Sequence, residues 1–301
     1  MSRQLSKEDL DKILQADSIE NLSVQQIFSL FREEKQLTDY LPDGIYHVDP
    51  RDGALITYNS KRARRPHDYV VPREEEPVSQ TCPICLGTTT GAIDVAELSE
   101  GFTFINKNLF PILGALDRID PKYLERMAHE EHFPMGKVSY GLHFLQWTSS
   151  LHDRDWHNIP LADRVIVLQR LAALEKKLLF ESDDMMPISE PWNPEKTTYG
   201  YVSIIKNCGS LVGGSLNHGH QQIAFSNVMP RKFYNNWRFF EQRKELFSKF
   251  LLRENPSQLL VRDYGEAALV VPYFMKRPYD MMILLKDVTK QYLSDLTLDE
   301  L

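Results

Sequence analysis

The sequence has few cysteines, no long apolar run and no excess of basic residues, and each absence excludes a class of protein. Only 3 of 301 residues are cysteine, too few for a disulfide framework and typical of a reducing compartment. No apolar run is long enough for a transmembrane helix, and the charged start of the chain lacks the apolar core of a signal peptide. Lys and Arg number 35 against 42 Asp and Glu, giving a net charge of −7, which argues against a general nucleic-acid binder. We therefore expect a cytoplasmic protein that binds neither a membrane nor a nucleic-acid polymer.

The remaining composition is that of a globular chain, with 42% hydrophobic, 11% aromatic and 26% charged residues. Its length is enough for about two domains. Helical periodicity predicts helices over 6–14, 23–34, 160–180 and 232–253. Alternating apolar residues predict strands over 54–58, 102–106, 142–148, 201–206 and 222–228, and a hairpin formed by 267–272 and 280–285. This mixture of strands and long helices predicts the α+β class.

Cys82 and Cys85 form a short-spaced pair in the stretch Cys-Pro-Ile-Cys. The spacing places two sulfurs on one tight turn, close enough to bind one zinc ion, although a structural zinc needs two further ligands. A redox pair is an alternative, but no thioredoxin-like βαβ pattern surrounds the motif, and two unrelated cysteines are a third interpretation. Cys208 has no partner at metal-binding spacing, so we expect it to be a small buried residue.

The strongest signal is a glycine-rich stretch that ends in two histidines, at residues 207–222. His218 and His220 are two residues apart, so on a strand both imidazoles would point to one face. The glycines allow the backbone to approach a bulky anion and to offer N–H groups to phosphate oxygens. Further neutral hydrogen-bonding groups come from Asn207, Ser215 and Gln222. The stretch predicts phosphoryl or nucleotidyl transfer with histidine as the nucleophile; a glycine turn before a strand with two surface histidines is the alternative.

The pattern N-x-G-x-x-x-G-x-S-x-x-H-x-H-x-Q in this stretch resembles the active-site strand of galactose-1-phosphate uridylyltransferases and ADP-glucose phosphorylases. These proteins form the transferase branch of the histidine-triad (HIT) superfamily. Other stretches resemble the branch in the same order, at 60–66, 82–85, 108–113, 141–152 and 271–279. The resemblance implies a HIT-like fold, an antiparallel sheet with packed helices, duplicated with an incomplete second half. The expected parts are a helical N-terminal extension (1–40), a first HIT-like half with the zinc site and catalytic histidine (41–230), and a linking helix with a partial second half (231–301).

The resemblance also implies roles for individual residues. His220 matches the nucleophile that becomes nucleotidylated, with Gln222 and Ser215 holding the non-bridging phosphate oxygens. Cys82, Cys85 and His218 match ligands of a structural zinc ion. Substrate contacts are implied for Arg62, Arg65, Asn108, Leu109, Asn207, Gly209 and Gly213. The basic run at 61–65 has a second interpretation as a solvated charged face.

The remaining zinc ligand is either His152 or His157. His152 directly follows the strand predicted at 142–148, where the ligand of the family lies, whereas spacing to the following helix favours His157. We favour His152 because the strand fixes its position, while an insertion in the following loop is easily tolerated. A third interpretation is that neither histidine binds a metal.

Together these features predict a nucleotidyltransferase that acts on a nucleoside diphosphate sugar or sugar 1-phosphate through a covalent nucleotidyl-histidine. The acceptor would be a sugar 1-phosphate or phosphate, and we expect a homodimer. The alternatives are a nucleotide-sugar phosphorylase or nucleotidyl hydrolase of the same superfamily, and a non-catalytic, zinc-stabilised nucleotide-binding protein. Gly219 departs from the proline common in uridylyltransferases, and the sequence stops where the family begins the helix of its second half. The base, the sugar and the acceptor therefore stay open.

Overall fold

The computed structural model describes residues 7–8, 18–48, 55–57, 59, 61–62, 82–122, 137–181, 200–208, 216–274 and 279–301. The chain divides into two compact units, Met1–Met229 and Pro230–Leu301. In the described part, no helix is both long enough and apolar enough to cross a membrane. Several sequence predictions lie outside the described residues: most of the helix at 6–14, and the site residues Arg65, Gly209, Gly213 and Ser215.

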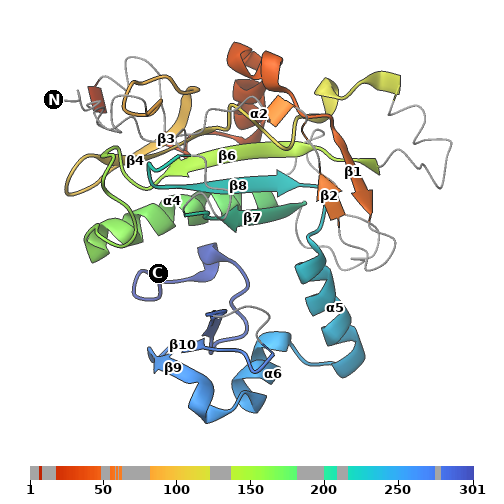
Figure 1. Cartoon of the computed structure of the whole chain (residues 1–301), viewed down its shortest axis with the longest axis vertical. Helices are drawn as coiled ribbons and strands as arrows, with labels where there is room; N and C mark the ends of the chain where they lie inside the picture. Colours follow the sequence, from red (N-terminus) through yellow and green to blue (C-terminus); the bar gives the residue numbers. More distant parts are fainter. Residues whose placement is uncertain are drawn as a thin grey trace, which may run out of the picture. The chain divides into compact units, whose positions relative to one another are not determined.

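The centre of the first unit is a five-stranded antiparallel sheet with the strand order β3-β4-β6-β8-β7 (Figure 1). Its strands are β3 (Ala92–Glu97), β4 (Phe102–Lys107), β6 (Gly141–Trp147), β7 (Tyr201–Ile205) and β8 (His220–Ser226). Strand β8 pairs with β6 on one side and with β7 on the other. Trp147 lies opposite His220, and Leu145 lies opposite Gln222. The sequence-predicted nucleophile therefore stands at the start of an interior strand, where β8 pairs with β6, while its pairing with β7 begins two residues later, at Gln222.

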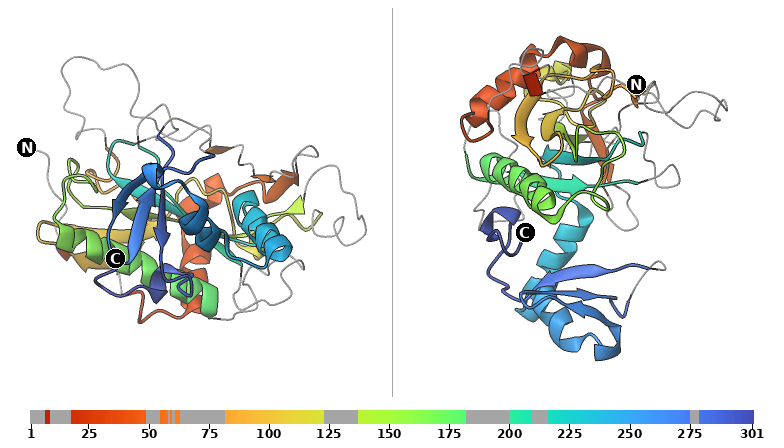
Figure 2. Two further views of the ribbon diagram at one scale, coloured as in Figure 1. Left: turned by 90° about the horizontal axis from the view of Figure 1, so that it is seen from below. Right: turned by 90° about the vertical axis from the view of Figure 1, so that its left-hand side faces the viewer.

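Helices α2 (Val24–Glu33) and α4 (Leu161–Phe180) cover one face of this sheet, as Figure 2 shows. The Phe31 ring of α2 lies 4.9 Å from the Phe144 ring of β6, and the Gln146 side chain of β6 donates to the Val167 carbonyl of α4 over 2.9 Å. Positions 144 and 146 point to the same side of a strand. The opposite face, to which Leu145 and Trp147 point, is left for the pocket described below.

The N-terminal segment is tied to the sheet and to α4 by a charged network. Arg170 of α4 pairs with Asp94 of β3 over 2.7 Å and with Glu20 over 2.6 Å. The Ile19 N–H donates to the Asp94 carboxylate over 2.9 Å. Since Asp94 is fully buried, its charge is compensated by these donors and the segment is held against the core.

A smaller antiparallel sheet with the order β2-β1-β5 completes the first unit. It consists of β1 (Ile45–Val48), β2 (Leu55–Thr57) and β5 (Lys137–Val138). Two short 3-10 helices also belong to this unit, η1 (Lys35–Tyr40) and η4 (Leu116–Arg118). The strands predicted near 54–58, 102–106, 142–148, 201–206 and 222–228 are confirmed, whereas β1, β3 and β5 were not predicted.

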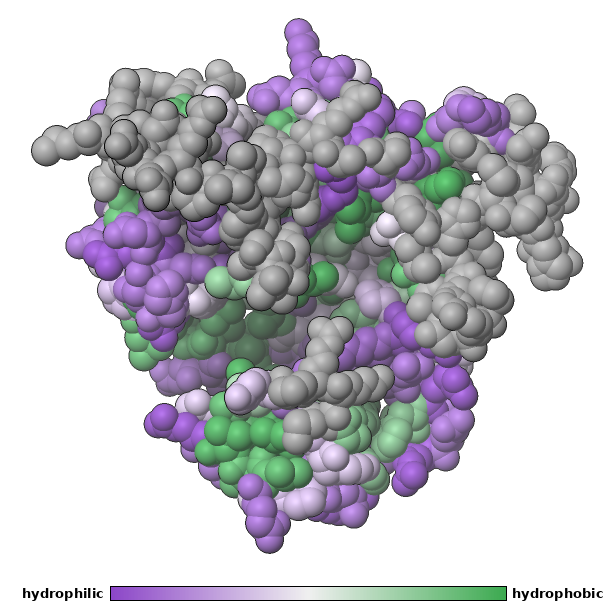
Figure 3. All heavy atoms as spheres, viewed as in Figure 1, coloured by the Kyte–Doolittle hydropathy of each residue, from purple (hydrophilic) through white to green (hydrophobic). Residues whose placement is uncertain are grey.

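The second unit contains helices α5 and α6 and a three-stranded antiparallel sheet of order β11-β10-β9. Its elements are α5 (Arg231–Arg243), α6 (Phe247–Glu254), η6 (Ser257–Leu259), β9 (Leu260–Asp263), β10 (Ala267–Val270), β11 (Met282–Leu285) and η7 (Leu293–Asp295). A small core forms around Leu251, Ala268, Val270 and Leu284. Figure 3 shows apolar side chains gathered over β9 and β10, where Leu260 and Val261 are exposed. The predicted hairpin of 267–272 and 280–285 is confirmed by the pairing of β10 with β11.

The prediction of one continuous helix over 232–253 is wrong. Lys244 ends α5 in the left-handed conformation, with φ 53°, and α6 begins three residues later. The Phe239 ring lies 5.4 Å from Phe247 and 5.1 Å from Phe250. In a straight helix, residues 239 and 247 would be separated by about 12 Å along the axis. The break thus allows three aromatic rings to pack together.

Candidate active site

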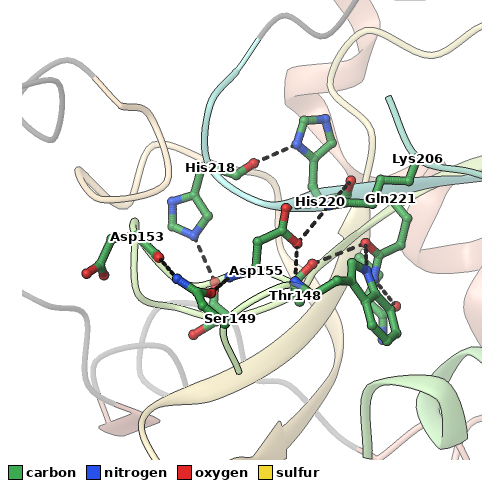
Figure 4. Close-up of polar contacts among 11 residues, drawn as sticks. Thr148, Ser149, Asp153, Asp155, Lys206, His218, His220 and Gln221 are labelled. Carbon is green, nitrogen blue, oxygen red and sulfur yellow. Dashed lines mark hydrogen bonds and ion pairs between the residues drawn. The ribbon is translucent and has the colours of Figure 1, made fainter. Parts of the chain in front are cut away.

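His220 opens strand β8 and is almost completely buried. Its Nδ1 donates a hydrogen bond to the carbonyl oxygen of His218, 2.8 Å away, as Figure 4 shows. Since a carbonyl can only accept, the proton lies on Nδ1 and the lone pair lies on Nε2. The indole of Trp147, directly opposite on β6, has its ring centre 5.0 Å from that of the imidazole. The geometry therefore presents one unprotonated ring nitrogen in a fixed orientation.

A pocket of about 330 Å³ lies beside His220, on the face of the sheet that the helices leave uncovered. This volume is in the range of small-molecule sites. Among the sequence-predicted site residues, those that line it are Arg62, Asn108, Leu109, His220 and Gln222. Asn207 lies just beyond the end of β7 and is not among the pocket-lining residues in the described part of the chain. The strand thus brings His220 and Gln222, two residues apart, to one polar side of the pocket.

Asn108 is held in the pocket wall by the buried residue His143. The carbonyl oxygen of His143 accepts from the Asn108 N–H over 2.8 Å, and the Nδ1 atom of its ring accepts from the Ile112 N–H over 3.0 Å. The Asn108 carbonyl oxygen accepts from the Phe110 N–H over 2.9 Å. Burial, and to a smaller extent the neighbouring Arg62 guanidinium, lower the pKa of His143 to about 3. His143 is thus a neutral core histidine, and sequence reasoning missed its support of Asn108.

Part of the pocket wall comes from residues that sequence reasoning did not select. Gln36 and Tyr40 of η1 line the pocket, together with Lys107 at the end of β4. The ammonium of Lys107 lies 3.1 Å from the Glu34 carboxylate, which also accepts from the Gly91 N–H. Burial lowers the pKa of Lys107, whereas Glu34 acts in the opposite direction. This buried pair joins the N-terminal segment to the pocket, a contact between distant segments that no local motif signals.

A second cluster, of two cysteines and two histidines, lies next to the catalytic strand. The ligand atoms of Cys82, Cys85, His152 and His218 all lie within 4.8 Å of one another, and the cluster could hold a metal ion. The Nδ1 atom of His218 lies 3.6 Å from the Cys82 sulfur and 3.7 Å from the Cys85 sulfur. The Nδ1 atom of His152 lies 3.4 Å from the Cys85 sulfur. These four are the residues predicted from the sequence; His157 is exposed and lies outside the cluster.

His218 has the protonation state that metal binding requires. Its Nε2 donates to the carbonyl oxygen of Ser149 over 2.8 Å, which leaves the lone pair on Nδ1 facing the two sulfurs. Burial, and to a smaller extent the adjacent His152 and His220 rings, lower the pKa of His218 to about 4. The imidazole is therefore neutral near pH 7 and can coordinate a cation without first losing a proton.

The expectation that Cys208 is buried is wrong, because its side chain is exposed. β7 is the edge strand of the five-stranded sheet and ends at Ile205. Cys208 follows that end, where the chain has left the sheet. The apolar character of cysteine predicted a buried side chain. Cys208 is exposed instead, because it follows the end of an edge strand.

Comparison with known proteins was made by sequence and by structure. No family model matches the chain. The chain is 22% identical over 256 residues to a curated ADP-glucose phosphorylase from Arabidopsis thaliana, covering 81% of this chain and 66% of that protein. The chain therefore spans just under two thirds of the length of this relative.

Solved structures share the fold. A uridylyltransferase structure matches with a TM-score of 0.56 and 19% identity, over 85% of this chain and 70% of that chain. An ADP-glucose phosphorylase from Arabidopsis thaliana with bound ADP-glucose matches with a TM-score of 0.51 and 16% identity, over 85% of this chain and 73% of that chain. These matches confirm the resemblance to the uridylyltransferase and ADP-glucose phosphorylase branch that the sequence motifs indicated.

Proposed function

We propose that this protein is a nucleotidyltransferase that acts on a nucleoside diphosphate sugar, with His220 as the nucleophile. The observation that carries the proposal is the Nδ1 hydrogen bond to the His218 carbonyl, which places the lone pair of the neutral ring on Nε2 in a residue that lines the pocket. The similarity to a uridylyltransferase and to ADP-glucose phosphorylases supports nucleotide sugars as the substrate class.

The reaction proceeds in two displacements at one phosphorus atom. His220 Nε2 forms a bond to the α-phosphorus while the bond from that phosphorus to the bridging oxygen breaks, and the sugar 1-phosphate leaves with the electron pair. The imidazole ring of the resulting nucleotidyl-histidine carries a positive charge, which the hydrogen bond from Nδ1 to the His218 carbonyl stabilises. An oxygen of the acceptor then attacks the same phosphorus and releases the neutral imidazole.

Different pocket residues would bind different parts of the substrate. Gln222 lies on the same strand face as His220 and is placed to donate to the non-bridging oxygens as charge develops. Arg62 supplies a positive charge in the same pocket, and Asn108 is fixed by its hydrogen-bonded neighbours. We assign Ser215, Gly209 and Gly213 to the phosphates, and Arg65, Leu109 and Asn207 to the nucleotide, from the sequence pattern alone.

We propose zinc as the metal of the cysteine and histidine cluster. In a tetrahedral zinc site, sulfur and nitrogen ligands lie about 3.5 Å apart, and three sulfur–nitrogen distances in this cluster are 3.4, 3.6 and 3.7 Å. Two thiolates and two neutral imidazoles are a ligand set typical of structural zinc. When bound, the ion would cross-link the Cys82 turn, the His152 loop and the segment before β8. With four protein ligands, no coordination position is left for a reacting water.

One comparison favours inorganic phosphate as the acceptor. The curated relative is named an ADP-glucose phosphorylase. Phosphorolysis would use the same histidine and the same leaving group, with phosphate attacking the nucleotidyl-histidine in place of a sugar 1-phosphate. Nucleotide-sugar phosphorolysis is therefore our second candidate function.

We also propose that Pro230–Leu301 is a partial second half of a duplicated HIT-like fold and that the protein is a homodimer. The first proposal is supported by the three antiparallel strands that follow two helices in this unit. Size-exclusion chromatography with light scattering would test the dimer, and a monomer mass would contradict it.

Label transfer to the protein tests the catalytic proposal. The chain is incubated with nucleotide sugars carrying ³²P at the α-phosphorus, for each common base, and the denatured protein is counted. Wild type and the matched control His157→Ala, which removes an exposed histidine, should become labelled, whereas His220→Ala should not. Chase with phosphate, a sugar 1-phosphate or buffer alone then separates phosphorylase, transferase and hydrolase. Label retained by His220→Ala, or no label on wild type with any nucleotide sugar, would contradict the proposal.

A further inference from the structure

The loop residue Asp155 occupies the space beside Gly219, the residue between the two site histidines. A Cβ atom placed on Gly219 would lie 2.5 Å from Cγ and 2.7 Å from Oδ1 of Asp155. Such distances are far inside van der Waals contact, so a side chain at position 219 excludes the present position of Asp155. Figure 4 shows the Asp155 carboxylate beside the chain segment that carries His218 and His220. The glycine therefore makes room for a carboxylate next to the backbone of the catalytic strand.

Asp155 in turn holds Lys206, which follows β7. The Lys206 ammonium lies 2.8 Å from both carboxylate oxygens, and the Trp156 N–H fixes one of these oxygens over 2.8 Å. The same ammonium donates to the carbonyl oxygen of His220 over 3.3 Å. Both side chains are mostly shielded, with exposed fractions of 27% for Lys206 and 16% for Asp155. This is a charge-assisted contact to the main chain of His220 itself.

The neighbours of His220 in the chain are held separately. The Gly219 carbonyl accepts from the Thr148 N–H over 2.9 Å. On the other side, the Gln221 amide donates to Gln146 over 2.9 Å and accepts from the Trp156 indole over 3.1 Å. The His220 carbonyl thus lies between a fixed peptide group at Gly219 and a fixed side chain at Gln221, and the Lys206 ammonium binds it.

We propose that Lys206 and Asp155 are positioning residues for His220, and that Gly219 is required because it admits Asp155. The proposal rests on the proposed function of His220. The ammonium fixes the His220 peptide, and the fixed peptide keeps the ring in the orientation that bonds Nδ1 to the His218 carbonyl. Nε2 then remains unprotonated and directed at the pocket before the substrate arrives.

Replacement of Lys206 by methionine tests this role. We expect the rate of nucleotidyl-histidine formation to fall by about ten-fold to a hundred-fold with little change in KM, because the substrate contacts are retained while the nucleophile is less well oriented. Lys206→Arg keeps the cation and should recover most of the rate. The matched control is Lys122→Met, which removes a lysine from an exposed ion pair with Asp120 and should react like wild type.

A spectroscopic measurement makes the test independent of turnover. In ¹⁵N-histidine-labelled protein, the ring signals lost in His220→Ala belong to His220, and in wild type they should report a proton on Nδ1. In Lys206→Met and Asp155→Asn they should shift toward a mixture of the two tautomers. Wild-type label transfer that fails with every nucleotide sugar would overturn the proposed function, while the tautomer measurement would still decide the positioning role. A wild-type rate and unchanged His220 signals in both variants would overturn the positioning role.

The assignment of Gly219 is tested by a double-variant cycle. Gly219→Ala should lower the unfolding midpoint more in the wild-type chain than in an Asp155→Ala chain, because the clashing carboxylate is gone in the latter. Equal effects in the two backgrounds would overturn it. Metal content measured on each variant shows whether the neighbouring cluster is still formed, so that a folding defect is distinguished from loss of orientation.

Discussion

The carbonyl oxygen of His218 accepts the Nδ1 proton of His220 over 2.8 Å, while the Nδ1 atom of the same His218 faces the sulfurs of Cys82 and Cys85. One residue therefore contributes its main chain to the proposed nucleophile and its side chain to the metal cluster. A shift of His218 would move the hydrogen-bond acceptor of His220, so the cluster and the proposed reaction would be coupled through this residue.

Loss of a cluster ligand should remove the metal and destabilise the first unit. For Cys82→Ser and His152→Ala we expect metal content to fall from about one ion per chain toward zero, with a lower unfolding midpoint, because a four-ligand structural site tolerates no loss of a ligand. Cys208→Ser and His157→Ala change exposed residues outside the cluster and serve as controls. Elemental analysis and thermal unfolding measure both quantities, and full zinc content in Cys82→Ser would refute the ligand assignment.

The buried histidine His143 should make stability depend on pH. Its pKa falls from 6.5 to about 3 on folding, so below pH 6.5 the unfolded chain binds a proton that the native chain does not. The contribution is complete above pH 6.5 and is lost as the pH falls toward 3, with a slope of at most about 1.4 kcal/mol per pH unit. Urea unfolding of wild type and His143→Gln at several pH values gives the difference in slope. Parallel curves would show that His143 does not titrate as described, and His157→Gln provides the exposed-histidine control.

Breaking the Lys107–Glu34 pair should cost more stability than removing an exposed pair. Lys107→Met leaves the Glu34 carboxylate shielded and without its cation, so we expect a loss of about 3 kcal/mol. Addition of Glu34→Gln should recover most of this loss, because the amide oxygen can still accept from the Gly91 N–H. Lys122→Met, in an exposed pair, should cost less than about 1 kcal/mol. Similar unfolding curves for Lys107→Met and Lys122→Met would contradict the special role of the buried pair.

The left-handed residue between α5 and α6 offers a stabilising substitution. Lys244 has φ 53°, a conformation that is strained for residues with a Cβ atom and natural for glycine at a helix end. Lys244→Gly should therefore stabilise the second unit by about 0.5 to 1 kcal/mol. Lys249→Gly, inside α6, should have the opposite sign by about 1 kcal/mol. Calorimetry on both variants decides the matter, and destabilisation by Lys244→Gly would show that the turn is not held as described.

Much of the central sheet follows from local sequence patterns. The strands that carry alternating apolar residues, such as β4, β6 and β8, were predicted within two residues at each end. Strands β1 and β5 are short. Strand β1 pairs with β2 on one side and with β5 on the other, so few residues within β1 or β5 indicate a strand. The helix break at Lys244 was missed because the pattern of apolar residues continues through it, and the contact of Phe239 with Phe250 depends on tertiary packing.

Some residues of the candidate site could likewise be predicted from the sequence, and others could not. Residues in a dense motif, such as His218 and His220, could be selected from the sequence because their spacing carries the chemistry. The choice of His152 over His157 depended on where a strand ends, which the sequence predicted well enough to favour the histidine that lies in the cluster. Tyr40 and Lys107 could not be selected, because they reach the pocket through contacts between segments far apart in the chain. Asp155 belongs to no sequence motif, and its proposed role is indicated by its short distance to Gly219 in the structure.

The separation of Cys82 from His218 has a consequence for how the chain matures. The two residues are 136 positions apart, and the entropy lost in closing such a loop must be offset before the fourth ligand arrives. During synthesis the ribosome releases Cys82 and Cys85 long before the segment with His218 and β8 emerges. An ion captured early by the two thiols would be held only loosely, and tight retention would begin when β8 pairs with β6 and β7. Metal retention by nascent chains would therefore report when the central sheet is complete.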